Sequence, residues 1–284
     1  MKARRRILAL VVALAVLGGL SVAAFSSPAR RAKAPVTVAT EAIPPPPHPA
    51  GTAVARREQN AIDRVRRYAP VITAGSARRR EVALTFDDGP SPYTAMILRV
   101  LARKHVPATF FIVGSQLTRF SRELRAELHR RETIGDHTES HAWLPHLSPA
   151  QQAHEIIDAG LRVRHDGGAF PRLFRPPYGV FNPTTLRVLR RARMLMVLWS
   201  VDPGDWRRPG AKAIVATVLA KTRPGAIVIL HDGGGYRNQT VAALPSIIDG
   251  LRRRHYRLVS VPRLLMDDPP PRHQHLPRFA QGGA

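Results

Sequence analysis

The chain has 284 residues, of which 44 are lysine or arginine and 20 are aspartate or glutamate, and it contains no cysteine. The missing cysteines exclude a disulfide framework, a thiolate metal site, a cysteine nucleophile and a lipid-modified cysteine anchor. A hydrophobic content of 44% excludes wholesale disorder, and the length suits one domain with extensions or two small domains.

The N-terminus is typical of an exported protein. Met1–Arg6 is basic, and Ile7–Leu20 is an uncharged apolar run with the length of a signal-peptide core. Small residues at Val22–Ala24 offer a cleavage site, whereas inclusion of Ser21–Phe25 makes the run long enough to span a bilayer. Residues 1–25 are therefore predicted to be a cleaved signal peptide or a retained membrane anchor. The protein is then secreted, held in the cell wall, or anchored at the extracellular face of the cytoplasmic membrane.

The formal net charge of +24 is compatible with nucleic acid, a membrane surface or an anionic wall polymer as a partner. Export favours the membrane surface and the wall polymer. The sequence has no basic motif interleaved with aromatic residues, as single-strand-binding proteins have, so we expect no nucleic-acid partner. Compositional bias is the alternative explanation, because most of the basic residues are arginine.

Residues 26–80 are predicted to be a Pro-rich linker and a lead-in segment. Proline, alanine and threonine dominate residues 26–53, and Pro44–Pro47 indicates a stiff, extended spacer. An amphipathic helix is expected over Ala55–Tyr68, as a lead-in to the folded domain or as part of a longer stalk.

Residues 81–266 are predicted to form the catalytic domain, because short apolar runs there alternate with amphipathic stretches. The predicted strands are Val82–Phe86, Thr109–Val113, Thr133–Gly135, Leu173–Arg175, Met194–Trp199, Ala226–Leu230 and Arg257–Ser260. The predicted helices are Ala95–Lys104, Ser121–Arg131, Pro149–His165, Pro183–Arg193, Ala211–Thr222 and Thr240–Arg254. This alternation indicates an α/β fold, either an open doubly wound sheet or a short barrel, with functional groups at the carboxyl ends of the strands. The tail, residues 267–284, is predicted to be disordered.

Five polar clusters follow successive predicted strands. They are Thr85–Pro90, His137–His141, Arg175–Gly179, Trp199–Trp206 and Ile229–Asp232. Each cluster alone has a structural interpretation, since Asp-Gly and Pro-Gly combinations form turns and paired prolines form rigid loops. Together, at the same end of successive βα units, they predict one functional site.

The residue types in these clusters suit metal-assisted catalysis. His137 and His141 are spaced by four, so on a helix they face the same way and can bind one metal ion; two surface histidines are the alternative. The adjacent Asp87 and Asp88 can divide between a base and a metal ligand. His231 ends a buried apolar run, where it is either structural or catalytic.

The five clusters together resemble the polysaccharide deacetylase family of carbohydrate esterases, whose shared unit is the NodB homology domain. The matching motifs are TFDDGP (Thr85–Pro90), HTESH (His137–His141), RPPYG (Arg175–Gly179), DPGDW (Asp202–Trp206) and ILH (Ile229–His231). The resemblance covers Glu81–Leu265; the last motif departs slightly, because the family usually has leucine at its first position. The resemblance implies a distorted (β/α) barrel of about seven parallel strands and a divalent metal, usually zinc and sometimes cobalt or manganese.

The resemblance also implies a role for each residue. Asp88, His137 and His141 bind the metal, Asp87 is the general base, and Arg175 holds Asp87 in place. The backbone N–H of Tyr178 and the metal share the oxyanion, and His231 protonates the leaving amine while Asp202 fixes its tautomer. The pocket for the acetyl group is formed by Trp206, Ile229, Leu230 and Tyr178. Asp205 is expected to be structural.

We therefore predict a monomeric hydrolase that removes N-acetyl groups from N-acetylglucosamine-containing cell-envelope polysaccharide, either peptidoglycan or a chitin-like polymer. The resemblance also permits O-deacetylation of a polymer such as acetyl-xylan, because ester and amide hydrolysis pass through similar tetrahedral intermediates. Two histidines and one carboxylate are also the facial triad of non-haem iron oxygenases, but Asp87 and His231 favour hydrolysis. The non-enzymatic alternative is a wall-binding module, although no expected metal or acid–base residue is missing.

Overall fold

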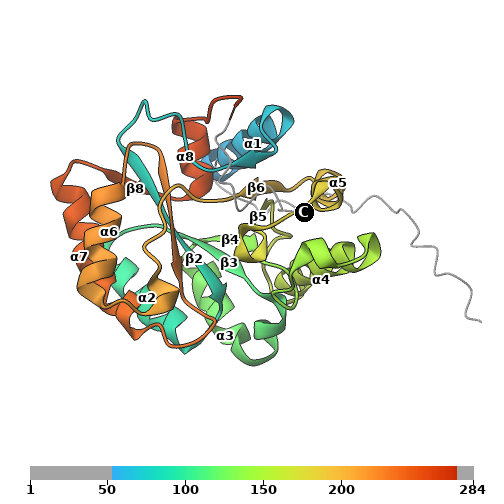
Figure 1. Cartoon of the computed structure of the whole chain (residues 1–284), viewed down its shortest axis with the longest axis horizontal. Helices are drawn as coiled ribbons and strands as arrows, with labels where there is room; N and C mark the ends of the chain where they lie inside the picture. The colour runs from blue at the N-terminus through green and yellow to red at the C-terminus, as the bar shows by residue number, and fades with distance from the viewer. Residues whose placement is uncertain (1–52, 274–284) are drawn as a thin grey trace, which may run out of the picture. The chain divides into compact units, whose positions relative to one another are not determined.

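In the computed structural model, which describes residues 53–273, strands and helices alternate along the chain and the strands form one sheet (Figure 1). The strands are β1 (Val71–Ile72), β2 (Glu81–Gly89), β3 (Thr109–Ile112), β4 (Thr133–Asp136), β5 (Leu173–Phe174), β6 (Leu195–Val197), β7 (Ala226–His231) and β8 (Arg257–Val259). The helices are α1 (Ala53–Tyr68), α2 (Pro92–Lys104), α3 (Leu117–His129), α4 (Pro149–His165), α5 (Pro183–Ala192), α6 (Ala211–Lys221), α7 (Asn238–Arg253) and α8 (Val261–Asp267).

The sheet has the order β1-β6-β5-β4-β3-β2-β7, and every pair of neighbouring strands is parallel. β8 pairs with the start of β2, on residues Glu81–Ala83. The segment after β6 returns to β7, where Val201 pairs with Val228 and the amide of Ile229 donates to the carbonyl of Val201 at 3.0 Å. The sheet thus curls into a distorted barrel. All seven predicted strands are present close to their predicted bounds, and the predicted fold class is confirmed.

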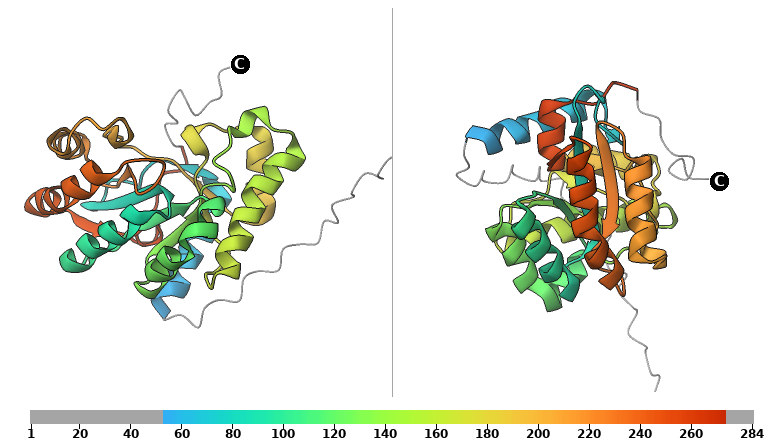
Figure 2. Two further views of the ribbon diagram at one scale, coloured as in Figure 1. Left: turned by 90° about the horizontal axis from the view of Figure 1, so that it is seen from below. Right: turned by 90° about the vertical axis from the view of Figure 1, so that its left-hand side faces the viewer.

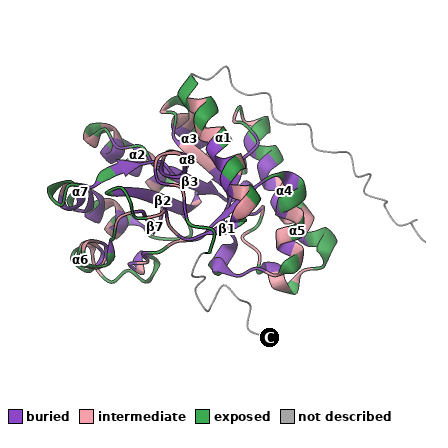
Figure 3. Cartoon of the chain, turned by 90° about the horizontal axis from the view of Figure 1, so that it is seen from above, coloured by how far each residue is buried: buried purple, intermediate pink, exposed green. Residues whose placement is uncertain are grey.

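Helices cover the outside of the sheet (Figure 2). The helices α1–α7 each have buried and exposed positions (Figure 3), whereas α8 has no exposed residue. Side-chain caps fix the N-termini of α2, α4, α5 and α8, as α2 illustrates. The Ser91 hydroxyl accepts from the amide of Tyr93, the amide of Ser91 donates to the Thr94 hydroxyl, and Pro92 occupies the first turn. This cap starts α2 at Pro92 rather than at the predicted Ala95.

The lead-in segment belongs to the folded domain, so the predicted start of the domain at residue 81 is too late. β1 pairs with β6 through Val71 and Ile72. One face of α1 carries Ile62 and Val65, which are buried in a cluster with Leu264 of α8. The amphipathic pattern of α1 therefore reflects packing against the barrel, and the alternative of a free stalk is wrong for residues 53–80.

The predicted boundary of the tail at residue 267 is too early. Asp268 is buried, and its carboxylate accepts hydrogen bonds from the Ser76 hydroxyl and from the amides of Arg78 and Arg79. The hydroxyl of Tyr68 donates to the carbonyl of Pro270 at 3.0 Å. The chain after α8 is thus tied to the lead-in segment as far as these contacts reach.

The predicted signal or anchor, the Pro-rich spacer and residues 274–284 lie outside the described residues. Within residues 53–273, no helix is both long enough and apolar enough to cross a bilayer.

The packing of α1 can be tested with two alanine substitutions. Ile62 is 1% exposed, so Ile62→Ala is expected to lower the free energy of unfolding by about 2–5 kcal/mol. Val54 lies on the same helix but is 45% exposed, so Val54→Ala should change it by less than about 0.5 kcal/mol. Urea denaturation of both variants measures the difference. Equal, small losses would show that α1 does not pack against the barrel.

Candidate active site

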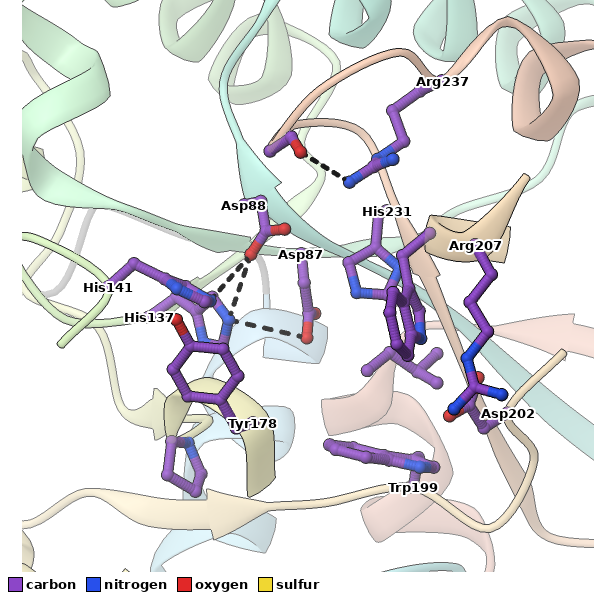
Figure 4. Close-up of a pocket in the computed structure, with 14 residues that line it drawn as sticks. Asp87, Asp88, His137, His141, Tyr178, Trp199, Asp202, Arg207, His231 and Arg237 are labelled. Carbon is purple, nitrogen blue, oxygen red and sulfur yellow. Dashed lines mark hydrogen bonds and ion pairs between the residues drawn. The ribbon is translucent and has the colours of Figure 1, made fainter. Parts of the chain in front are cut away.

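The five polar clusters meet at the carboxyl ends of the strands, around a cavity of about 490 Å³ (Figure 4). Asp87 and Asp88 end β2, His137 and His141 follow β4, and His231 ends β7. In Figure 4, Asp88 and the two histidines lie on one side of Asp87, and His231 lies on the other. Parallel strands present their carboxyl ends at one face, which is why residues so distant in sequence converge here.

Asp88, His137 and His141 form a group with the dimensions of a metal site. Oδ1 of Asp88 lies 3.4 Å from Nε2 of His137 and 3.1 Å from Nε2 of His141. One donor atom from each residue falls within 4.8 Å of the others. Two imidazoles and one carboxylate are a ligand set that zinc accepts, with room left for water and substrate.

The hydrogen bonds of this group fit a cation between its members. Nδ1 of His137 lies 2.7 Å from the carbonyl oxygen of Arg175, which can only accept, so Nδ1 carries the proton. In the neutral ring, Nε2 of His137 then points a lone pair towards Asp88. Oδ1 of Asp88 is itself buried without a hydrogen-bond partner. A lone pair facing a carboxylate oxygen is unfavourable unless a cation lies between them, so these residues suit a divalent metal.

The two histidines are on a loop, and the expected helical geometry is wrong. Thr138 and His141 have positive φ angles of 69° and 62°, which turn both imidazoles to one side without a helix. The loop is held by short-range hydrogen bonds, from the amide of Thr138 to Asp136 at 2.9 Å and from the amide of His141 to the Thr138 hydroxyl at 3.0 Å. Glu155 of α4 accepts from the amide and hydroxyl of Ser140. A turn, and not a helix, therefore brings the imidazoles of His137 and His141 to the same side.

Asp87 is a buried carboxylate whose partner is Arg175. Nη1 of Arg175 lies 2.6 Å from Oδ1 of Asp87, and both side chains are almost fully buried. The guanidinium also donates to Thr85 and to the carbonyls of Val197 and Leu198. Its position is thus fixed from three directions. Oδ2 of Asp87, the oxygen that Arg175 does not bind, lies 3.8 Å from Nε2 of His137.

The carboxylate that orients His231 is Asp205, and the assignment of this contact to Asp202 is wrong. Oδ1 of Asp205 lies 2.7 Å from Nδ1 of His231, and Oδ2 accepts from the backbone amide of the same histidine at 2.9 Å. The hydroxyl of Thr240 donates to Asp205 as well. Asp202 instead caps its own turn by accepting from the amide of Gly204, although it still lines the cavity. Gly204, which lies between the two aspartates, has a left-handed backbone, and Asp205 directly after it is buried.

The surroundings of His231 favour its protonated form. Burial lowers the pKa of an imidazole, but the hydrogen bond to Asp205 and the charges of Asp205, Asp88 and Asp87 outweigh that effect and raise the pKa of His231 to about 9. These contacts favour an imidazolium in which Asp205 engages Nδ1 and leaves Nε2 as the second N–H.

The predicted acetyl-pocket residues are divided between the cavity and the core. Ile229 and Trp206 line the cavity, as does Tyr178. Leu230 does not, and this prediction is wrong: its side chain is fully buried in the hydrophobic cluster on the other face of β7. Successive side chains of a strand point to opposite faces, so Ile229 and Leu230 could not both face the site. Tyr178 follows two prolines and has a positive φ of 60°.

Arg237 and the glycine run before it were missed from the sequence. Arg237 lines the cavity and is buried. Its guanidinium donates to the carbonyls of Gly233 and Gly234 in its own loop. Gly234 has a φ of 68°, and a Cβ there would collide with Oδ2 of Asp88. Three consecutive glycines directly after a strand-end His-Asp pair are the signal that could have been used, since they mark a close backbone approach.

Comparison with known proteins gives concordant matches. A family model described as "Polysaccharide deacetylase" matches residues 74–197. A chitooligosaccharide deacetylase of Bradyrhizobium sp. is 39% identical over 198 residues, covering 65% of this chain and 90% of that protein. A peptidoglycan-N-acetylglucosamine deacetylase of Bacillus cereus is 39% identical over 187 residues, covering 65% and 87%. The crystal structure of the Bc1960 peptidoglycan N-acetylglucosamine deacetylase superposes with a TM-score of 0.68 at 31% identity, covering 72% of this chain and 96% of that one.

Removal of one predicted ligand tests the metal site without an activity assay. His141→Ala should weaken Zn²⁺ binding by more than about 100-fold, because loss of a residue that only orients a ligand already costs 10–100-fold. Calorimetric titration of the metal-free protein with Zn²⁺ measures the change. His154 of α4 is an exposed histidine outside the cluster, so His154→Ala is the matched control and should bind Zn²⁺ as the unsubstituted protein does. Equal affinities for the two variants would contradict the site.

Proposed function

The chain belongs to the polysaccharide deacetylase family, and we propose that it hydrolyses N-acetyl groups of N-acetylglucosamine-containing polysaccharide at the Asp88–His137–His141 site. The observation that supports this most directly is the position of Asp87, a buried carboxylate between the candidate metal ligands and the protonated His231. Hydrolysis of an amide needs a base on one side of the carbonyl and an acid for the leaving amine on the other, and the site offers both.

The group held by Asp88, His137 and His141 is proposed to be Zn²⁺, with Co²⁺ or Mn²⁺ as alternatives. When bound, such an ion lowers the pKa of a water molecule and polarises the acetamide carbonyl. The fixed tautomer of His137 directs its lone pair to this position, as described above.

Asp87 is proposed to be the general base. Because Arg175 occupies Oδ1, Oδ2 of Asp87 is the oxygen left to take a proton from the attacking water. The four hydrogen bonds of Arg175 keep the carboxylate from rotating out of place, which is the positioning role that we assign to this arginine. Removal of the proton makes the water nucleophilic at the moment of attack.

His231 is proposed to be the general acid. Its Nδ1 is engaged by Asp205, so the proton on Nε2 is the one that can pass to the departing sugar amine. The N–H of Tyr178 is proposed to donate to the oxyanion, and Ile229 and Trp206 to contact the methyl end of the acetyl group from the wall of the cavity.

We further propose that the protein is exported and acts as a monomer on an envelope polymer, with peptidoglycan as the first candidate and a chitin-like polymer as the second. The basic segment Met1–Arg6 and the apolar run Ile7–Leu20 support export, and the net charge of +24 supports attraction to an anionic wall polymer or membrane surface. Acetate release from peptidoglycan, chitooligosaccharides and acetyl-xylan, with and without added Zn²⁺, tests the activity and separates N- from O-deacetylation. No release from any of the three would contradict the proposed function.

Substitution of the two adjacent aspartates should affect metal content and activity differently. Asp87→Asn removes the base and leaves the ligand group intact, so it should lose at least about 10²-fold in kcat while retaining bound metal. Asp88→Asn should lose metal and activity together. Metal content by atomic absorption and acetate release from the same samples make the comparison. Full activity of Asp87→Asn would refute the assignment of the base.

The corrected partner of His231 can be tested by pH dependence. Its pKa of about 9 is raised by Asp205, so protonated His231 is available below this pH and is lost above it. Asp205→Asn removes the charge that raises the pKa, and the alkaline limb of the kcat/KM profile should move to lower pH by about one to three units. Asp202→Asn should leave that limb in place. A shift with Asp202→Asn alone would restore the assignment made from the sequence.

A further inference from the structure

One end of the barrel is strongly basic. Residues 78–81, 103–104, 221–223 and 252–257 hold eleven arginine and lysine residues and one acidic residue, Glu81. Ten of these eleven basic residues are exposed, whereas Glu81 is buried. We refer to these four segments as the basic end.

Hydrogen bonds between the segments show that they form one continuous face. Nη2 of Arg252 lies 2.6 Å from the carbonyl oxygen of Lys104, and Nη2 of Arg80 lies 2.8 Å from that of Arg254. The guanidinium of Arg254 donates in turn to the carbonyl of Leu219 in the last turn of α6. α7 packs against both α2 and α6, and Figure 1 shows these three helices on one flank of the sheet. The basic residues are therefore neighbours in space as well as in the sequence.

The basic end lies opposite the cavity. Its segments lead into the amino ends of β2, β3, β7 and β8. Asp87 and Asp88 lie at the carboxyl end of β2, and His231 lies at that of β7. Because parallel strands have all their amino ends on one side, the length of the strands separates the basic end from the site. The cavity and the cationic face thus point in opposite directions.

Part of this positive charge stabilises helix ends and carboxylates within the domain. The arginines that donate to backbone carbonyls at or near helix C-termini are Arg80, Arg223, Arg252 and Arg254. The helix dipole favours cations at such positions. Lys104 lies 2.8 Å from Asp249, and Arg257 pairs with Glu81 and Asp267. These six side chains therefore have a role inside the domain.

The other five cations of the basic end have no such role. The side chains that form no hydrogen bond or ion pair with any residue in the described part of the chain are Arg78, Arg79, Arg103, Lys221 and Arg253. Like charges gathered on one face repel one another, which destabilises the compact state. An anionic partner outside the domain removes this cost.

The side chains of the basic end suit a charged surface and not an aromatic or apolar contact. None of the exposed large hydrophobic side chains of residues 53–273 belongs to it. Its one phenol ring, that of Tyr256, is 7% exposed and lies 4.6 Å beneath the guanidinium of Arg80. Single-stranded nucleic acids stack on exposed rings, and membrane-inserting proteins use exposed apolar side chains. Attraction at this face is therefore electrostatic and confined to the surface of the partner.

We propose that the basic end docks the protein on the surface of an anionic phospholipid bilayer, with the cavity facing away from the lipid. A bilayer presents a broad field of phosphate groups, which matches four segments spread over one end of the barrel better than a single polymer strand does. A polymer held at the basic end would lie at the wrong end of the barrel for hydrolysis in the cavity. The proposal narrows the attraction inferred from the net charge to one face and one partner, and it does not depend on deacetylase activity.

The orientation can be tested with a fluorescent label, because the chain has no cysteine and a single introduced one is labelled specifically. Ala220 and Ala242 are both exposed; Ala220 lies in the last turn of α6, beside the basic end, and Ala242 lies near the start of α7. Full-length Ala220→Cys and Ala242→Cys proteins are mixed with phosphatidylglycerol vesicles that carry a nitroxide on the lipid headgroup. The label at residue 220 should lose most of its fluorescence, and the label at residue 242 should keep most of it. Equal quenching of the two labels would refute the orientation.

Charge substitutions in the labelled Ala220→Cys protein test the face itself. Arg103→Gln/Arg253→Gln removes two cations without a partner in the described domain, so the fold should be unaffected. Each cation near an anionic surface contributes about fivefold to binding, so the lipid concentration for half-maximal quenching should rise about 25-fold. Arg119 and Arg122 are exposed in the first half of α3, after the carboxyl end of β3, so Arg119→Gln/Arg122→Gln is the control of equal charge and should change it little. An equal effect of both variants would show that net charge, and not the basic end, causes binding.

The nature of the partner is tested with the same label and two further probes. Phosphatidylcholine vesicles with the same nitroxide lipid should not quench it, and about 1 M NaCl, which shortens the screening length to about 3 Å, should abolish quenching by phosphatidylglycerol vesicles. Inorganic polyphosphate represents a soluble polyanion. Polyphosphate binding that Arg103→Gln/Arg253→Gln weakens, without quenching by anionic vesicles, would assign the basic end to a wall polymer and overturn the bilayer as its partner. Acetate release enters none of these measurements, so their outcome is independent of the proposed function.

Discussion

The buried pair of Arg175 and Asp87 is the interaction on which the arrangement of the site depends. The guanidinium reaches the end of β2 through Asp87 and Thr85 and the end of β6 through the carbonyls of Val197 and Leu198. The backbone carbonyl of Arg175 also fixes the ring of His137. One residue therefore aligns the proposed base, a candidate metal ligand and two strand ends. Burial of this pair is costly without hydrogen bonds, and the barrel supplies an acceptor to each of the three guanidinium nitrogens.

Charge is divided across the cavity in a way that supports two opposite proton transfers. Asp87 is held as an acceptor by an arginine, while His231 is held as a donor by Asp205. Arg175 orients Asp87, Asp205 orients His231, and both partners are buried. Asp87 is therefore held as a proton acceptor and His231 as a proton donor. The ring of Tyr178 meets that of His141 edge-on at 4.7 Å, on the side of the candidate metal ligands.

Most of the barrel and the identity of the converging clusters could be predicted from the sequence, because alternation of apolar and amphipathic segments and the polar residues after strands are local patterns. Other features depend on tertiary contacts that no local pattern reveals. β1 has only two residues, which is too short for a recognisable strand pattern. The apolar face of α1 packs in one cluster with α8, a contact that the sequence of α1 alone does not reveal. The choice between Asp202 and Asp205 depends on which carboxylate reaches His231 across the fold. The alternation of side chains along β7 shows that only one of Ile229 and Leu230 can face the cavity, but which one does so depends on the tertiary structure.

Four residues of the site that are not glycine have left-handed backbone, namely Asp88, Thr138, His141 and Tyr178. Each such residue costs about 1–3 kcal/mol, and it persists only where surrounding contacts impose it. Here these contacts come from the barrel and its loops, so the free energy of folding holds these residues in their left-handed conformation. The proposed metal site is consequently preorganised: chelation and reloading are expected to exchange ions reversibly within an intact scaffold, and its rigidity should disfavour ions that demand a different coordination geometry.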